Sequence, residues 1–209
     1  MRFMENFIST YNVSPEAARL LSHGIEILRV WQDKLNLISA HSLKDVWTRH
    51  VADSYQLYQY LNIDTKTVYD IGSGAGFPAI VLAIAAQTDK RPTKFKLIES
   101  ITKKTVYLND VRNKLGLKNV EIINDRAENL HIKPADIITA RAVANLNKLL
   151  GLAYPLTNLN TVLILPKGQG YALEVDEAKQ NWHFDIKVLQ NEVESQGVVL
   201  ILSNLRKKR

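Results

Sequence analysis

The sequence predicts an α/β protein built on a doubly wound, mostly parallel sheet, with a helical extension before it and an antiparallel hairpin at its end. From Lys66 onward, short apolar runs alternate with helical segments of about ten residues, which is the pattern of βαβ units. Residues 1–62 instead carry apolar side chains at helical spacing. Near the C-terminus, "WHFDIKVLQ" alternates apolar and polar residues, and a polar turn separates it from "GVVLIL", as in a strand pair.

The N-terminal segment, residues 1–65, is predicted to be a helical extension. Ser14-Pro15-Glu16 is typical of a helix start, because it supplies an N-cap hydroxyl, a proline in the first turn and an acid that favours the helix dipole. A second helix is predicted from Ser42 to Leu61, and "KLNLISA" between the two helices is predicted to be a loop.

Residues 66–209 are predicted to form a single α/β domain with a seven-stranded sheet. Parallel strands are expected over Thr67–Ile71, Phe95–Ile98, Val120–Ile123, Asp136–Thr139 and Thr161–Leu165. Helices are expected over Pro78–Gln87, Thr102–Leu115 and Asn145–Leu152, and the C-terminal hairpin supplies the last two strands. Ligands in such sheets bind beyond the carboxyl ends of the strands, so functional residues are expected there.

The composition is that of a soluble globular protein, with 46% hydrophobic and 23% charged residues. No apolar run approaches the ~20 residues of a membrane helix, and "MRFMENFIST" lacks the apolar core of a signal peptide. The chain has no cysteine, which excludes disulfides, thiolate metal sites and thiol nucleophiles and fits a reducing compartment. We therefore expect a cytoplasmic monomer without a membrane partner.

Positive charge is concentrated in one part of the chain, whose formal net charge is +6. Residues 66–118 carry 10 basic and 4 acidic side chains, whereas residues 1–65 carry 6 and 7. Four further bases form the tail Arg206-Lys207-Lys208-Arg209. A basic patch suits a polyanion such as RNA, because neutralised phosphates release counterions. A solvated, soluble surface is the alternative that charge alone leaves open.

The stretch "YDIGSGAGFPAI" places three glycines in five positions between the first predicted strand and helix. Gly72, Gly74 and Gly76 are spaced two and two, which excludes the dinucleotide pattern G-x-G-x-x-G. No Gly-Lys-Ser/Thr follows, which excludes the phosphate-binding Walker pattern. What remains is D-x-G-x-G-x-G, which resembles the motif of class I S-adenosylmethionine-dependent methyltransferases. A tight strand-to-helix turn without a ligand is the alternative.

Two acids at strand ends support a cofactor site there. Glycines remove Cβ atoms and let a ligand approach the backbone. Asp70 ends the first strand and is expected to orient the turn or the methionine ammonium of the cofactor. Glu99 ends the next strand, where a carboxylate can accept hydrogen bonds from both ribose hydroxyls. Each acid taken alone could be a surface charge.

Further candidate residues follow the later strands. Ala127 and Glu128 lie after the third strand, where this superfamily frames the adenine; Glu128 could instead be a capping or solvent-facing acid. Arg141 ends the fourth strand and could alternatively pair with Asp70 or Glu99. His50 and Asp53, three apart, could line the target pocket or be buried, and Lys103-Lys104 could contact RNA or solvent. No spacing of His, Asp and Glu indicates a metal site.

Residues that the chain lacks exclude several classes of methyl acceptor. Without cysteine there is no covalent nucleophile for pyrimidine C5, and "ITARAVAN" lacks the Asn/Asp-Pro-Pro-aromatic signature used on exocyclic amines. The acid of the ribose-methylating Lys-Asp-Lys-Glu set is also missing, because Arg141 holds that strand end. Small molecules remain possible as methyl acceptors. So does a ring nitrogen such as guanine N7, whose lone pair needs no base to deprotonate it.

Several motifs together resemble one family. "WQDKLNLIS", "RHVADS", "DIGSGAGFPAIVLAI", "ESITKKTVYLNDV", "DRAEN", "ARAVANL" and "LPKG" occur in order between Trp31 and Gly168. They resemble the bacterial guanine-N7 methyltransferase of small-subunit ribosomal RNA, a family also called glucose-inhibited division protein B or methyltransferase G. The chain departs from the family at Ala79 and Val81, where a glycine and a proline are usual, and at Ala140, which replaces a common serine.

The resemblance implies a class I fold with an N-terminal helical extension and S-adenosylmethionine as cofactor. It implies methylation of N7 of guanine 527 in 16S ribosomal RNA, with that RNA or the small ribosomal subunit as partner. By the same resemblance, cofactor contacts are expected from Gly72, Phe77, Ala127, Glu128 and Arg141, and Arg141 is the expected catalytic residue or orders the target loop. A methyltransferase for a small molecule or protein, and a non-catalytic RNA-binding module, are the alternatives.

Overall fold

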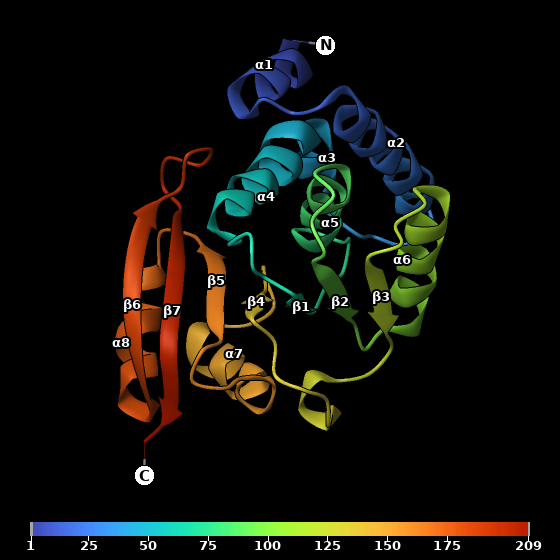
Figure 1. The fold of residues 1–209 in the computed structure, drawn as a ribbon. Helices are drawn as coiled ribbons and strands as arrows, with labels where there is room; N and C mark the ends of the chain where they lie inside the picture. The colour runs from blue at the N-terminus through green and yellow to red at the C-terminus, as the bar shows by residue number, and fades with distance from the viewer. Residues whose placement is uncertain (1, 209) are drawn as a thin grey trace.

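The fold was analysed in a computed structural model, which describes residues 2–208. Its centre is a seven-stranded sheet of order β3-β2-β1-β4-β5-β7-β6 (Figure 1). The strands are β1 (Thr67–Ile71), β2 (Lys94–Ile98), β3 (Val120–Ile123), β4 (Ile137–Thr139), β5 (Val162–Lys167), β6 (Trp182–Gln190) and β7 (Val198–Lys207). Strands β1 to β5 pair in parallel, and β7 pairs antiparallel to both β5 and β6. The predicted parallel sheet with a C-terminal antiparallel hairpin is confirmed.

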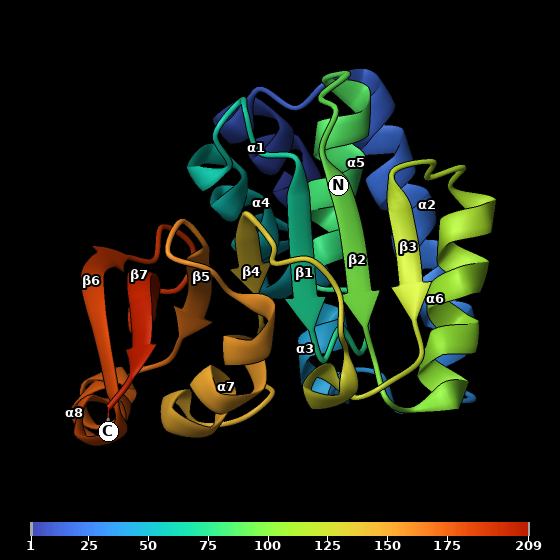
Figure 2. The ribbon, with the colours of Figure 1, turned by 60° about the horizontal axis from the view of Figure 1, so that its bottom comes forward.

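Helices cover both faces of the sheet. They are α1 (Arg2–Tyr11), α2 (Pro15–Gln32), α3 (Ala40–Lys44), α4 (Asp53–Tyr55), α5 (Ala79–Thr88), α6 (Thr102–Lys114), α7 (Leu146–Ala153) and α8 (Tyr171–Asn181). The π-helical turn is η1 (Trp47–Ala52), and the 3-10 turns are η2 (Gln56–Tyr60), η3 (Ala127–Asn129) and η4 (Tyr154–Leu156). Figure 2 shows α7 and α8 on the side of the sheet opposite α5 and α2.

Two hydrophobic clusters hold these layers together. The first joins α1, α2, η1 and α4 to α5, α6 and one face of the sheet, and the second joins α7, α8 and β6 to the other face. Helix α5 is buried from Ala79 to Ala86, because it lies between the sheet and the N-terminal helices. A helix that is apolar all round is expected in such a position. The N-terminal helices therefore share their core with the α/β part of the chain.

The predicted helix start at Ser14 is confirmed, and the predicted single helix from Ser42 to Leu61 is wrong. Ser14 Oγ accepts a hydrogen bond from the backbone N–H of Ala17 at 3.2 Å, and α2 begins at Pro15. The second segment is instead divided into α3, a π-helical turn η1, the short α4 and a 3-10 turn η2. The predicted loop "KLNLISA" lies between α2 and α3 and is confirmed up to the first residue of α3, Ala40. The spacing of apolar residues does not reveal the π-helical turn η1. Tertiary contacts accompany it, since Arg49, His50 and Asp53 all contact Arg141.

Helix α8 was not predicted. Only Val175 and Ala178 of its residues are buried, so its sequence lacks the broad apolar face by which helices are recognised. The other predicted helices and strands of residues 66–209 are confirmed to within three residues at their ends, apart from β7, which continues to Lys207.

The topology brings distant parts of the chain to one edge of the sheet. Strands β1, β4 and β5 run in parallel, so their carboxyl ends meet there. Lys167 at the end of β5 is paired with Val198 at the start of β7, and Val198 is paired with Gln190 at the end of β6. The loop of residues 191–197 between β6 and β7 therefore lies at the same edge. It is called the hairpin loop below.

Candidate active site

The glycine turn after β1 requires glycine at the positions that the sequence singled out. Gly72, Gly74 and Gly76 have φ angles of 66°, 52° and 87°, in the left-handed region that side chains disfavour. A Cβ at Gly72 would lie 2.7 Å from Val143 Cγ2, and one at Gly76 would lie 2.7 Å from Ile80 Cγ1. At Gly74 the nearest atom to the Cβ position is 3.7 Å away, and this residue lines a cavity of about 610 Å³.

Glu99 and Asp70 lie directly beside this turn, as predicted for acids at adjacent strand ends. Glu99 is buried and accepts hydrogen bonds from the backbone N–H groups of Gly74 at 2.9 Å and Ile101 at 2.8 Å. Asp70 Oδ1 accepts a hydrogen bond from Thr139 Oγ1 at 2.7 Å, while Oδ2 is buried without a partner among the described residues. Burial raises the pKa of Asp70 to about 7, against the lowering effect of its hydrogen bonds. The unpartnered oxygen is therefore available to a hydrogen-bond donor, and a nearby cation would favour its ionised form.

Two cavities flank the turn. The larger has a volume of about 610 Å³ and is lined by residues 72–75 of the turn, by Phe77 and Arg141, by the end of β5 and by the hairpin loop. The smaller, of about 190 Å³, lies between Gly72, Ala127, Glu128 and the segment after β4. The structure therefore places Ala127 and Glu128 beside the glycine turn but in a separate cavity from Arg141.

The two residues of the smaller cavity differ in character. Ala127 is buried at the start of η3, whereas the side chain of Glu128 is 42% exposed and lies 3.6 Å from Arg126 Nη1. An ion pair this exposed contributes little to stability. The carboxylate of Glu128 is therefore accessible from the cavity.

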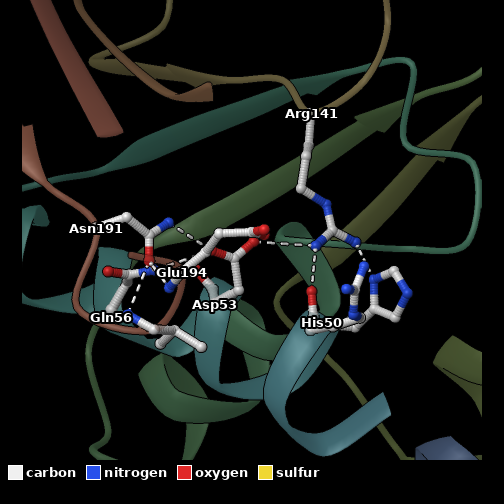
Figure 3. Close-up of polar contacts among 8 residues, drawn as sticks. His50, Asp53, Gln56, Arg141, Asn191 and Glu194 are labelled. Atoms are coloured by element: carbon white, nitrogen blue, oxygen red, sulfur yellow. Dashed lines mark hydrogen bonds and ion pairs between the residues drawn. The ribbon is translucent and has the colours of Figure 1, made fainter. Parts of the chain in front are cut away.

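Arg141 is held at the end of β4 by the N-terminal helices rather than by Asp70 or Glu99. Its Nη1 donates to Asp53 Oδ2 at 3.1 Å and to the backbone oxygen of Arg49 at 3.0 Å, and its Nη2 contacts His50 Nδ1 (Figure 3). The guanidinium carbon also lies 5.3 Å from the ring centre of Phe77. The alternative of pairing with Asp70 or Glu99 is thus wrong. All three contacts come from η1 and the first residue of α4, the segment that departs from a regular helix.

His50 is a neutral partner of Arg141. Its ring stacks on Phe77 with centroids 4.8 Å apart and an interplanar angle of 23°. Burial, together with the nearby charges of Arg141 and Arg49, lowers the pKa of His50 to about 3. The neutral imidazole accepts from Arg141 at Nδ1, which assigns the proton to Nε2. Nε2 is buried and has no partner among residues 2–208.

Asn191 was not singled out in the sequence, yet it links the hairpin loop to Asp53. Its Nδ2 donates to Asp53 Oδ1 at 2.7 Å, and its Oδ1 accepts from Gln56 Nε2 at 3.0 Å (Figure 3). The same oxygen accepts from the backbone N–H groups of Val193 and Glu194, each at 2.8 Å. An asparagine directly after a strand indicates a turn, but nothing local indicates a partner 138 positions away.

Lys167 and Glu174 form a second polar link that sequence reasoning missed. Lys167 Nζ donates to Glu174 Oε2 at 2.6 Å and to the backbone oxygen of Ala144 at 3.1 Å. Glu174 also accepts from the backbone N–H of Leu146, the first residue of α7, at 2.7 Å. The link fixes the segment after β4 against the end of β5, where both line the larger cavity.

Among residues 2–208, no group of three or more His, Asp and Glu side chains is arranged to hold a metal ion. The same residues include no helix that combines the length and the apolar character needed to cross a bilayer.

Comparison with known proteins agrees with this geometry. The family model of the rRNA small subunit methyltransferase G, GidB, matches residues 18–200. The ribosomal RNA small subunit methyltransferase G of Bartonella tribocorum is 39% identical over 197 residues, covering 93% of this chain and 91% of its own length. The protein of the same name from Cereibacter sphaeroides is 35% identical over 201 residues, covering 96% and 97%.

A solved structure shares the fold. The structure of M. jannaschii TYW2 in complex with AdoMet, which is S-adenosylmethionine, matches with a TM-score of 0.57 and 16% identity, covering 78% of each chain. The predicted class I methyltransferase fold and the resemblance of the sequence motifs are both confirmed. The chain belongs to the family of the ribosomal RNA small subunit methyltransferase G.

Proposed function

We propose that this chain is an S-adenosylmethionine-dependent methyltransferase that modifies N7 of a guanine in 16S ribosomal RNA, at the position that corresponds to guanine 527. The observation that carries the proposal is a cavity of about 610 Å³ that is lined by the glycine turn and Arg141, with the buried acids Asp70 and Glu99 directly beside that turn. The family relationship supports RNA as the acceptor.

The residues of the turn fit the cofactor. Gly72, Gly74 and Gly76 leave space where side chains would intrude. The unpartnered oxygen of Asp70 suits the methionine ammonium, directly or through water, and its ionised form would be stabilised by that cation. Glu99 uses one lone pair of each oxygen on the backbone N–H groups of Gly74 and Ile101 and retains others for ribose hydroxyls.

The adenine end of the cofactor is assigned to the smaller cavity. Ala127 and Glu128 would frame the base there, and Phe77 would contact the cofactor from the side of the larger cavity. The cofactor supplies an activated methyl group. What the protein must then do is to hold the acceptor nitrogen in line with it.

Guanine N7 is an acceptor that this site can serve without a general base. Its lone pair attacks carbon directly, and no proton has to leave during the transfer. Arg141 is proposed to contact both the cofactor and the target nucleotide, held by Asp53 and His50. Arg49 and Lys104 line the same cavity and can neutralise phosphates of the RNA.

The wider setting is inferred from the same relationship. The partner is 16S ribosomal RNA or the small ribosomal subunit, which the protein would meet as a cytoplasmic monomer. Residues 1–65 are proposed to act as an extension that supports Arg141, and residues 66–209 as the methyltransferase domain. The contacts of Asp53 and His50 with Arg141 support this division of roles.

Methyl transfer tests the proposal. The purified chain is incubated with a methyl-labelled cofactor and small ribosomal subunits, and label in RNA and in protein is counted separately. We expect label in 16S RNA, and we expect Glu99→Gln to weaken cofactor binding about tenfold or more, since it removes a charged acceptor. The matched control is Glu121→Gln. It removes an exposed acid of β3 that is paired with Lys96 of β2, and it should change cofactor binding little. Label in ribosomal protein alone would refute RNA as the substrate.

A further inference from the structure

The inference concerns how the site selects its base, and it rests on the function proposed above. Three carboxylates line the larger cavity: Asp53, Glu174 and Glu194. Asp53 is occupied by Arg141, Asn191 and Gln56, and Glu174 by Lys167 and the backbone of Leu146. Within residues 2–208, only Glu194 of these three has no hydrogen-bond or ion-pair partner for its carboxylate. It is also exposed.

Glu194 is held in place although its side chain is free. Its backbone N–H donates to Asn191 Oδ1 at 2.8 Å, and its carbonyl accepts from Gly197 N at 2.9 Å. Asn191 in turn donates to Asp53, the ion-pair partner of Arg141 (Figure 3). The loop that carries Glu194 is therefore fixed relative to the guanidinium in the site. Such support is what a residue that positions a substrate needs.

A free acid here is costly for an RNA site unless it binds hydrogen-bond donors. Of the basic residues at the cavity, Arg141 and Lys167 are paired with acids, while Arg49 and Lys104 suit phosphates, which Glu194 repels. Guanine offers two donors on its Watson–Crick edge, N1–H and the N2 amino group. Adenine presents an acceptor at N1, and uracil has no amino group. A carboxylate accepts only, so among these bases it complements guanine best.

The position of Glu194 matches the shape of the base. Strands β4 and β5 separate β1 from β7, so three strand spacings place the hairpin loop on the order of 14 Å from the glycine turn. That span leaves room for a base between the methyl donor at the turn and Glu194. A guanine that directs N7 toward the turn directs N1 and N2 away from it. The edge with the two donors thus faces the hairpin loop.

We propose that Glu194 selects guanine by accepting hydrogen bonds from N1–H and the N2 amino group of the target base. Removal of the N2 amino group should then reduce transfer in the wild-type protein and matter much less once the carboxylate is gone. A site built to hydrogen-bond a group discriminates against a substrate that lacks it. Glu192 provides a matched control. It lies two residues away on the same loop, but it binds Tyr11 and Gln59 and is absent from the lining of the cavity.

The test uses small subunits reconstituted with RNA that carries guanosine or inosine at the target position. Inosine retains N7 and N1–H and lacks only the N2 amino group. The wild-type chain and Glu192→Gln should prefer guanosine by about 10- to 100-fold in kcat/KM, the range for a hydrogen bond to a charged group. In Glu194→Gln the preference should fall to a few-fold. The ratio is internal to each variant, so a reduced folded fraction does not change it.

The outcomes separate this inference from the proposed function. If Glu194→Gln keeps the wild-type preference for guanosine, Glu194 does not read the base and the inference is overturned. If the wild-type chain transfers no methyl group to the guanosine subunits, the proposed function itself is wrong. A loss of activity in Glu194→Gln that is equal on both substrates also contradicts the inference.

Discussion

His50 shows how a single half-buried residue makes the site sensitive to acid. Its pKa of about 3 in the folded state lies below the ordinary value of 6.5, because burial and two arginines disfavour its charged form. The unfolded chain therefore binds a proton at this position below about pH 6.5, while the folded chain does not until about pH 3. Asp70 acts in the opposite sense. Its pKa is raised to about 7, so its contribution to stability is lost as the pH rises toward 7.

We predict that the wild-type protein loses stability relative to His50→Gln as the pH falls from about 6.5 to about 3. The histidine contributes a loss of at most about 1.4 kcal/mol per pH unit, whereas the opposite contribution of Asp70 is present in both proteins and cancels in the comparison. The free energy of unfolding is measured by urea denaturation at several pH values. His41→Gln, on the exposed His41 of α3, is the control. Parallel curves for wild type and His50→Gln would show that His50 titrates normally.

At the scale of elements, the predicted strands were correct where burial alone decides them. Strand β1 is Thr67–Ile71 as predicted, because an apolar run bounded by a glycine turn has few alternatives in this setting. The segment from Ser42 to Leu61 was predicted wrongly, because local spacing does not report its tertiary contacts with Arg141, which follows β4. The role of Asn191 could not be predicted either, because it also depends on a tertiary contact. Its partner Asp53 lies 138 residues away, and local patterns do not report such contacts.

The residues of the candidate site also fall into those that the sequence could predict and those that it could not. Asp70, Glu99 and the three glycines surround one turn, so their proximity follows from strand order and could be predicted. The partner of Arg141 could not, because it depends on how the N-terminal helices pack. Glu194 likewise became visible only when the hairpin loop was placed beside the cavity.

Two glycines of similar backbone conformation can be compared: Gly72 in the glycine turn and Gly116 after α6. Gly72→Ala should destabilise the fold by about 1 to 3 kcal/mol and abolish cofactor binding, since its Cβ would lie 2.7 Å from Val143 Cγ2. Gly116 also has a left-handed φ of 61°, but nothing lies within 4 Å of its Cβ position. Gly116→Ala should therefore cost about 1 kcal/mol and leave binding unchanged. Thermal unfolding and calorimetry measure both effects. Equal effects of the two substitutions would mean that the turn does not adjoin the cofactor.

For the whole molecule, the net charge of +6 and the basic residues at the cavity predict salt-sensitive RNA binding. Affinity for 16S RNA should fall about tenfold or more when salt rises from about 50 to about 200 mM, because several phosphates are neutralised. Arg49→Gln should reduce the logarithmic slope by about 0.7, whereas Arg19→Gln, on the exposed Arg19 of α2, should not. Filter binding at several salt concentrations measures the slopes. A flat dependence would indicate a small uncharged substrate.

The most direct measurement is to map the modified nucleotide. Small subunits from cells that lack this activity are incubated with the chain and cofactor, and the RNA is cleaved chemically at N7-methylguanine and sequenced. We predict one new cleavage, at the guanine that corresponds to position 527 of 16S RNA, and none with Arg141→Ala. Methylation of another atom or another nucleotide, or of none while the cofactor is bound, would contradict the assignment.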